Sequence, residues 1–190
     1  FINSLMDKIG FIQNLIDNLE GVSKGAKYLL ENNDWSKGDK ALLAHIGNST
    51  DEFRFAVEAA LKNNLNNLLV ESIEDLRRGI QQLKRNKIGK ASFLLLNTDP
   101  VNKKNILDKL SNYFEKKKAH RLEKETGFKD WAKNCIQTEA KWKPFFDRML
   151  DKVAVVDSLE TALSLRDKFN TFYFATINGD YIGGSGIVEA

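Results

Sequence analysis

Four glycines near the C-terminal end of the chain could act through the backbone alone: Gly179, Gly183, Gly184 and Gly186. Glycine allows two backbones to approach closely and tolerates positive φ, which suits an edge strand that pairs with a second subunit. A local hairpin turn uses glycines in the same way and is the alternative interpretation. The candidate interface residues of this segment are Gly179, Ile182, Gly183, Gly184, Gly186 and Ile187.

Two groups of cations could contact phosphates. Lys84, Arg85, Lys87 and Lys90 follow one another with no acid among them, and Lys116, Lys117 and Lys118 form a second run. Lysine and arginine presented together bind nucleic-acid backbones in a salt-dependent way, whereas most charge runs are only solvated faces. No recognition-helix motif is present, so we expect no base-specific reading.

The residue types that usually perform catalysis are sparse and scattered. His45 and His120 are the only histidines, and neither has a cysteine or carboxylate at metal-ligand spacing. Cys135 lies in an apolar stretch near Trp131 and Ile136, which favours a buried structural thiol over a nucleophile. There is no Walker motif. We therefore expect no enzymatic activity, no metal and no cofactor.

The composition of the chain limits the classes of protein to which it can belong. The chain has 190 residues, of which 42% are hydrophobic, enough for one large or two small cores; its formal net charge is +3. One cysteine excludes an internal disulfide and favours a reducing compartment. Charges interrupt every apolar run before it reaches the roughly 18 residues of a membrane span. Because the chain begins at Phe1 without a leader, we expect it to be a piece of a longer polypeptide.

The first twenty residues carry an apolar repeat at alternating spacings of three and four. Ile2, Leu5, Ile9, Ile12, Ile16 and Leu19 form this heptad seam. The seam predicts one strand of a coiled coil, while a helix that packs on its own domain is the alternative.

A longer pattern occurs twice in the chain. Residues 52–76 and 141–163 each predict a helix, a buried strand and a second helix capped by a serine, Ser72 in the first copy and Ser158 in the second. We expect two related halves in an approximate two-fold arrangement. Between them, residues 105–125 predict a charged linker helix. The predicted division is an arm segment at 1–20, subdomain I at 21–98, a linker at 99–126 and subdomain II at 127–190.

Three stretches of the chain resemble motifs of one known family. Residues 55–97 contain Lys87-Ile88-Gly89-Lys90-Ala91-Ser92-Phe93-Leu94-Leu95-Leu96, similar to the element K-x-G-R-A-T-F-L-P-L. Residues 141–165 resemble the segment L-L-G-x-x-x-V-V-D-D-L-E-x-A-L, and Thr176–Val188 (TINGDYIGGSGIV) resembles the segment T-L-D-G-D-x-x-x-x-S-G-x-x-T-G-G. Together these motifs resemble the hinge domain of SMC (structural maintenance of chromosomes) proteins.

This resemblance implies a mixed α/β hinge fold with a coiled-coil arm. It also implies a prokaryotic chromosome condensation and segregation protein, in the cytoplasm at the nucleoid, whose hinge forms a homodimer and contacts DNA without sequence preference. In that family ATP hydrolysis belongs to a separate head. Neither a membrane nor a small-molecule substrate is implied.

The chain departs from the family pattern at two places. Lys40-Ala41-Leu42-Leu43-Ala44-His45-Ile46 stands where the family has a glycine-bearing G-x-x-x-D-L-I segment, and Gly186 is not followed by the family's Gly-Gly pair. A hinge that pairs only with a different hinge and a small α/β enzyme are the competing classes. The enzyme would require a deep polar pocket with converging titratable groups.

Overall fold

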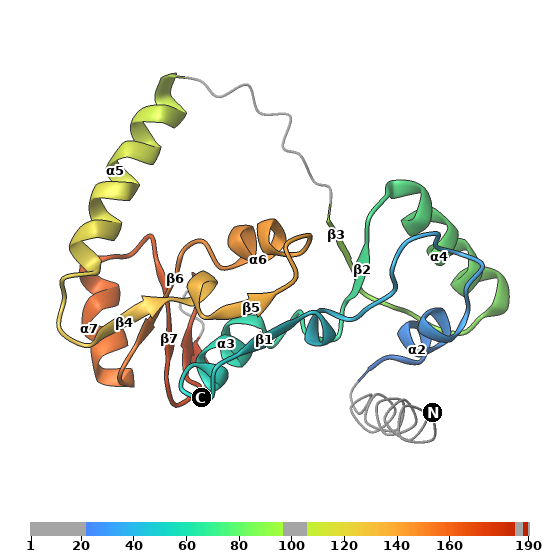
Figure 1. Cartoon of the computed structure of the whole chain (residues 1–190), viewed down its shortest axis with the longest axis horizontal. Helices are drawn as coiled ribbons and strands as arrows, with labels where there is room; N and C mark the ends of the chain where they lie inside the picture. The colour runs from blue at the N-terminus through green and yellow to red at the C-terminus, as the bar shows by residue number, and fades with distance from the viewer. Residues whose placement is uncertain (1–21, 97–105, 185–187, 190) are drawn as a thin grey trace, which may run out of the picture. The chain divides into compact units, whose positions relative to one another are not determined.

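The computed structural model describes residues 22–96, 106–184 and 188–189 (Figure 1). They form two compact units. Residues 22–43 and 66–96 belong to unit 1, and residues 44–65 join the rest of the chain in unit 2. The heptad seam from Ile2 to Leu19, and with it the predicted coiled-coil arm, lies outside the described residues.

Unit 1 contains two helices and a small parallel sheet. α2 (Lys24–Glu31) begins after Ser23, whose hydroxyl oxygen accepts a hydrogen bond from the Ala26 N–H. β2 (Leu68–Val70) is buried along its whole length, and α4 (Ile73–Asn86) connects it to its parallel partner β3 (Phe93–Leu95). A strand, a crossover helix and a parallel strand form the smallest unit that can bury such a sheet.

Trp35 is the centre of the unit 1 core. It is 1% exposed, and its indole N–H donates to the Leu29 carbonyl at 2.7 Å. Arg78 of α4 donates to the Trp35 carbonyl at 2.9 Å. A Cβ on Gly79 would lie 2.9 Å from the Trp35 ring, so the missing side chain lets α4 pack directly on the indole. The other buried members of this core are Val22, Ala26, Leu29, Leu42, Leu68, Val70 and Leu83.

Unit 2 is built on a five-stranded sheet with the order β4-β6-β7-β8-β9. β6 (Val153–Val156) and β7 (Tyr173–Thr176) are parallel and connected by α7 (Leu159–Lys168). The remaining strands pair antiparallel: β4 (Phe128–Trp131) with β6, β8 (Tyr181–Ile182) with β7, and β9 (Val188–Glu189) with β8. β9 is therefore an edge strand.

Both faces of the central strands are covered. β6 is buried at every residue, and so are the neighbouring Phe174 and Ala175 of β7, whose side chains point to opposite faces. Phe174 packs with Ala162 and Leu165 of α7. α3 (Arg54–Leu61), which comes from the first half of the sequence, packs on β7 and β8. Helices from both halves of the sequence, α3 and α7, therefore pack on this sheet.

The duplicated pattern is present as two matching series of elements. The first runs from the single turn η1 (Leu43–His45) through β1 (Gly47–Ser49), α3, β2 and α4 to β3. The second runs from η2 (Ala132–Asn134) through β5 (Ile136–Thr138), α6 (Lys143–Met149), β6 and α7 to β7. Both predicted caps are confirmed, because Ser72 accepts the Asp75 N–H at 3.0 Å and Ser158 accepts the Thr161 N–H at 3.2 Å. The predicted mixed α/β class is also confirmed.

One segment joins a unit that the sequence alone does not indicate. Residues 44–65 lie inside the span that we expect for subdomain I, yet their contacts place them in unit 2. Two features hold them there: α3 packs on β7 and β8, and β1 pairs antiparallel with β5. Residues 66–96 then belong to unit 1 again.

The predicted linker contains α5 (Ile106–Leu122), which belongs to unit 2. Its last turn is anchored by Leu122, which is fully buried in the core of this unit. The C-terminal end of α5 lies at the sheet, and its N-terminal end extends away from it (Figure 1).

Candidate functional site

The glycine-rich segment begins as a tight hairpin between β7 and β8. Gly179 has φ of +100°, and its N–H donates to the Thr176 carbonyl at 3.0 Å. The Thr176 hydroxyl donates to the Asp180 carboxylate at 2.7 Å and accepts the Asp180 N–H at 3.0 Å. Gly179 therefore has the turn role that is the alternative interpretation of the sequence, since only glycine adopts this backbone at little cost. Its part in an interface stays a prediction.

The residues after the hairpin differ in how accessible they are. Ile182 is 1% exposed and packs in the core of unit 2, so its side chain anchors β8. Gly183 and Gly184 line a surface hollow of about 470 Å³ together with Tyr173, Arg166 and Asn170. A Cβ on Gly184 would lie 3.2 Å from the exposed Tyr173 ring. Gly186 and Ile187 lie outside the described residues.

The edge strand β9 carries an exposed apolar side chain. Val188 is 48% exposed although it lies opposite the buried Ile182. Glu189, its neighbour, lies 3.7 Å from the Lys62 ammonium, which ties β9 to the end of α3. An edge strand keeps one row of backbone donors and acceptors unpaired within its own sheet, and a second chain can pair with such a row.

The first basic group lies at the C-terminal end of α4. Lys84 and Arg85 are in the last helical turn, where cations are favoured by the helix dipole. Lys87 ends the helix in the left-handed conformation, with φ of 53°, and Lys90 follows it. All four side chains are exposed, and none of them forms an ion pair with another described residue. The structure thus brings this group together at one helix end in unit 1.

The second basic group, Lys116, Lys117 and Lys118, lies on α5 in unit 2, and all three side chains are exposed. The acids around them have other partners. Glu115 binds Lys152 at 2.8 Å, and Glu125 binds Lys168 at 3.3 Å. None of these three lysines forms an ion pair with an acid among the residues whose side chains are described.

Cys135 is a buried structural thiol, as its apolar surroundings predict. It is 6% exposed, and its Sγ donates to the Trp131 carbonyl at 3.4 Å. Burial raises the pKa of this thiol to about 12, with the Asp130 and Glu52 charges adding to the effect. A nucleophilic cysteine needs a low pKa instead. Burial also lowers the pKa of His45, and among the described residues no three ligand side chains form a metal-binding group.

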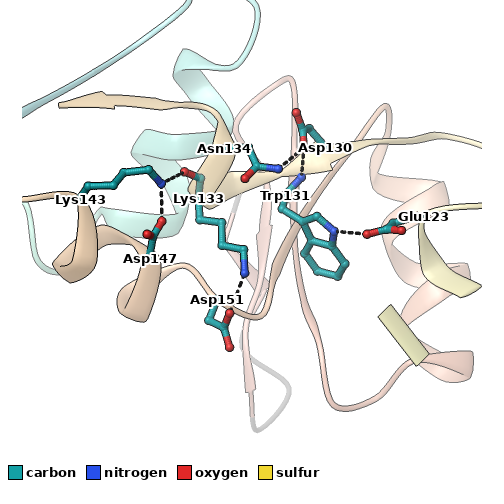
Figure 2. Close-up of polar contacts among 8 residues, drawn as sticks. All are labelled: Glu123, Asp130, Trp131, Lys133, Asn134, Lys143, Asp147 and Asp151. Carbon is teal, nitrogen blue, oxygen red and sulfur yellow. Dashed lines mark hydrogen bonds and ion pairs between the residues drawn. The ribbon is translucent and has the colours of Figure 1, made fainter. Parts of the chain in front are cut away.

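A polar network around β4 and η2 is the feature that motif reading misses. Figure 2 shows the Trp131 indole pointing to Glu123, whose carboxylate accepts its N–H at 2.8 Å. This hydrogen bond is the main cause that lowers the pKa of Glu123. Lys133 binds Asp151 at 2.8 Å, and Lys143 donates to the Lys133 carbonyl at 3.0 Å while pairing with Asp147.

The Trp131–Glu123 and Lys133–Asp151 contacts line a groove of about 540 Å³ in unit 2, together with Phe172. Lys133 and Lys152 in its lining are paired with Asp151 and Glu115, whereas Lys116 forms no ion pair with a described residue. Such exposed ion pairs stabilise the fold only slightly. No local spacing marks the Lys133–Asp151 pair, because its residues belong to separate elements, whereas Lys143 and Asp147 form an i,i+4 pair within α6. In the described part of the chain no helix is both long and apolar enough to cross a membrane.

The geometry described above belongs to a known family of domains. Residues 36–166, more than half of the chain, match the model of the "SMC proteins Flexible Hinge Domain". The chain therefore belongs to the SMC hinge domain family, which confirms the resemblance seen in the sequence.

The curated relatives that the chain matches are much longer proteins. It is 27% identical over 145 residues to the "Chromosome partition protein Smc" of Methanocaldococcus jannaschii, covering 76% of this chain and 11% of that protein. It is 26% identical over 187 residues to the protein of the same name from Halothermothrix orenii, covering 98% of this chain and 15% of that protein. The chain thus spans less than a sixth of the length of these relatives.

Solved structures agree on the fold. A chain from an asymmetric dimer of the Geobacillus stearothermophilus SMC hinge domain aligns with a TM-score of 0.74 at 18% identity, covering 99% of this chain and 75% of the other. The Pyrococcus furiosus Smc hinge domain with an extended coiled coil aligns with a TM-score of 0.64 at 21% identity, covering 96% and 60%.

Proposed function

We propose that this chain is the dimerisation hinge of a chromosome condensation and segregation protein. Two copies associate and so join the coiled-coil arms of two long chains. Family membership supports this proposal, and so do the names of the relatives, which are chromosome partition proteins. Further support comes from the solved hinges, one described as a dimer and one as carrying an extended coiled coil. The arm is assigned to residues 1–20, the two halves of the hinge to 21–98 and 127–190, and the linker to 99–126.

The observation that carries the dimer is the edge of the unit 2 sheet. β9 ends the sheet with an exposed Val188, and the glycine pair before it leaves the surface beside Tyr173 uncovered. A second copy that pairs along β9 would satisfy the free backbone groups and cover this valine. Gly183 and Gly184 allow the close approach that such pairing needs.

The interface is tested by adding charge to this edge. The double variant Gly184→Glu/Val188→Glu should remain folded, because Tyr173 is exposed and can move and because Val188 already faces solvent. Charge at a pairing edge opposes association, so sedimentation equilibrium should give the mass of one chain. Leu163→Glu is the matched control, since Leu163 is 44% exposed on α7 and should leave the dimer intact.

An unchanged mass for the double variant would remove this edge from the interface. Association that occurs only after a different hinge is added would instead identify a hinge that forms heterodimers. Gly179 is not used in this test, because its positive φ makes any larger residue strained there and would confuse folding with association.

We also propose that the hinge contacts DNA without sequence preference. The support is the two groups of exposed cations at the end of α4 and on α5, which are not paired with acids among the described residues. Such contacts would act near the nucleoid in the cytoplasm, where we place the protein. Its role is structural and not enzymatic, in line with the raised pKa of its single thiol.

Charge reversal tests the DNA contact. The variant Lys84→Glu/Arg85→Glu/Lys87→Glu should bind a duplex more weakly and with a flatter salt dependence, because the slope falls by about one for each phosphate that no longer pairs with a cation. The matched control reverses three exposed cations elsewhere in unit 1, Lys24, Lys37 and Arg77, and keeps the same net charge. An equal decrease in both variants would mean a diffuse charge effect, and no binding by the intact chain at low salt would reject the contact.

A further inference from the structure

Two adjacent aromatic side chains of α5 face solvent. Tyr113 and Phe114 are 62% and 60% exposed. The side of this helix that packs on the unit 2 core carries the fully buried Leu122 and the partly buried Ala119. Since an α-helix has about 3.6 residues per turn, the two rings lie on roughly the opposite side, which we call the outward side of α5.

The sequence before these rings has the residue types of an apolar helix side. Ile106, Leu107 and Leu110 precede Tyr113 and Phe114 at spacings of three and four, and all five residues belong to α5. The N-terminal end of this helix extends away from the unit 2 sheet (Figure 1). An apolar repeat with such spacing is normally covered by another element. In the described part of the chain, Tyr113 and Phe114 nevertheless stay mostly exposed.

The outward side of α5 is also positively charged. The acids of this region have other partners, since Glu115 pairs with Lys152 and Glu125 pairs with Lys168. Exposed apolar surface next to uncompensated positive charge matches a ligand that is both apolar and negative. Five exposed cations follow the rings, and none of them forms an ion pair with another residue whose side chain is described: Lys116, Lys117, Lys118, Arg121 and Lys124.

We propose that the outward side of α5 is the docking site of a second, different protein, which binds through a helix that is apolar on one side and acidic along its edges. The apolar side of that helix covers Tyr113 and Phe114, and its carboxylates pair with Lys117 and Arg121. By the helical period these two cations lie on the same side of α5 as the rings. Helices recognise one another through apolar anchors at spacings of three and four, and opposite charges fix their orientation. The inference goes beyond the proposed function, because neither the dimer nor the DNA contact requires this partner.

The charge of this side disfavours a second copy of the chain as the occupant. Two copies that met through their outward sides would bring five cations against five cations, and like charges that face each other cost several kcal/mol. An acidic helix turns the same charges into attraction.

The shape of the apolar surface disfavours a nucleic acid as the occupant. The centroids of Tyr113 and Phe114 are 5.8 Å apart and their planes are inclined by 73°, so the edge of one ring meets the face of the other. This T-shaped pair presents a stepped surface, into which apolar side chains fit better than flat bases. The aliphatic residues that precede the rings in the sequence offer no π-face on which a base can stack.

The test uses a synthetic peptide of about 21 residues, three heptads long, with leucine at positions a and d and glutamate at e and g. Fluorescence anisotropy follows its binding to the 190-residue chain. One peptide should bind per chain. A peptide of the same composition in scrambled order has the same charge but no apolar side, so it should bind at least about tenfold more weakly.

The rings are tested by their removal. Tyr113→Ala/Phe114→Ala should weaken binding of the ordered peptide about thirtyfold, the size expected when a central aromatic anchor is lost. Phe114→Tyr keeps the ring and should keep the affinity within about threefold. Circular dichroism should show the same fold for these variants, since both side chains are exposed.

The cations are tested by exchanging charges. Lys117→Glu/Arg121→Glu should weaken binding of the acidic peptide about tenfold, whereas a peptide with lysine in place of glutamate should bind this variant more tightly than it binds the intact chain. The matched control is Lys24→Glu/Arg77→Glu, which makes the same change of net charge at exposed positions of unit 1. It should alter binding of the acidic peptide less than about twofold.

The outcomes separate this inference from the proposed function. No binding of the ordered peptide to the intact chain, or equal binding of the ordered and scrambled peptides, would overturn the inference while the dimer mass and the binding of duplex DNA stand on their own measurements. If Tyr113→Ala/Phe114→Ala gave the mass of one chain, the outward side would belong to the dimer. If this variant lost affinity for DNA but kept its affinity for the peptide, the rings would contact nucleic acid. Either result would also overturn the inference.

Discussion

At the scale of single residues, burial decides the chemistry of Cys135. Its thiol has a pKa of about 12, against an ordinary value of 9.0, because the charged thiolate would lose its hydration inside unit 2. The protonated form is thus favoured in the folded chain. The contribution of this group to stability is fully present below pH 9 and is lost as the pH rises toward 12, because the unfolded chain then releases the proton more readily.

We predict that Cys135 reacts slowly with a disulfide reagent in the folded chain up to about pH 9 and rapidly in urea. The matched control is Gln137→Cys in a Cys135→Ala background, because residue 137 is exposed on β5 only two positions away. The introduced thiol should react with the pH profile of an ordinary cysteine. Equal reaction rates for the two thiols in the folded chain would contradict the burial that the structure shows.

The glycines show how far a residue pattern can be interpreted from the sequence. The cluster at 179–186 marks a segment where the backbone matters, and that much is visible in the residue types. The separate roles are not visible. Gly179 makes a turn with positive φ, whereas Gly184 lies against the Tyr173 ring, and only the pairing of β7 with β8 creates this difference.

At the scale of elements, the duplicated serine caps are among the features that local sequence predicts well. Ser72 and Ser158 each accept an N–H three residues ahead, which satisfies a donor that the first helical turn would otherwise leave free. Such caps can be predicted from the sequence because the residues that interact are close together in it. The strands that directly precede the caps, β2 and β6, can be predicted for a similar reason, since their apolar runs are continuous.

We predict that Ser72→Ala and Ser158→Ala each lower the free energy of unfolding by about 1 kcal/mol. Urea unfolding followed by circular dichroism measures both changes. The control is Ser164→Ala in the exposed middle of α7, where alanine is the better helix former and stability should hold or rise slightly. A cost at residue 164 equal to that at residue 158 would show that capping is not the cause.

Other elements could not be predicted because their partners are distant in the sequence. β1 is a short polar strand, Gly47-Asn48-Ser49, with no apolar alternation, and it exists through its pairing with β5. α3 has a clear apolar face, but the sequence of this helix and its neighbours does not indicate that the face packs on β7 and β8. On α5, Tyr113 and Phe114 are exposed whereas Leu122 is buried, and only the packing of the folded chain distinguishes these apolar residues.

At the scale of the whole molecule, the two compact units do not coincide with the two halves of the sequence. Residues 44–65 cross from the first half into unit 2, so that unit depends on both halves of the duplicated sequence. A cut between the halves would therefore remove α3 from the sheet that it covers. We expect neither half of the sequence alone to form a stable unit 2.

The central claim, that this chain is a dimerisation hinge, is tested most directly by its mass in solution. Sedimentation equilibrium at tens of micromolar should give twice the chain mass of 21.6 kDa, and Gly184→Glu/Val188→Glu should give that mass once. A strict monomer of the intact chain at these concentrations would contradict the claim.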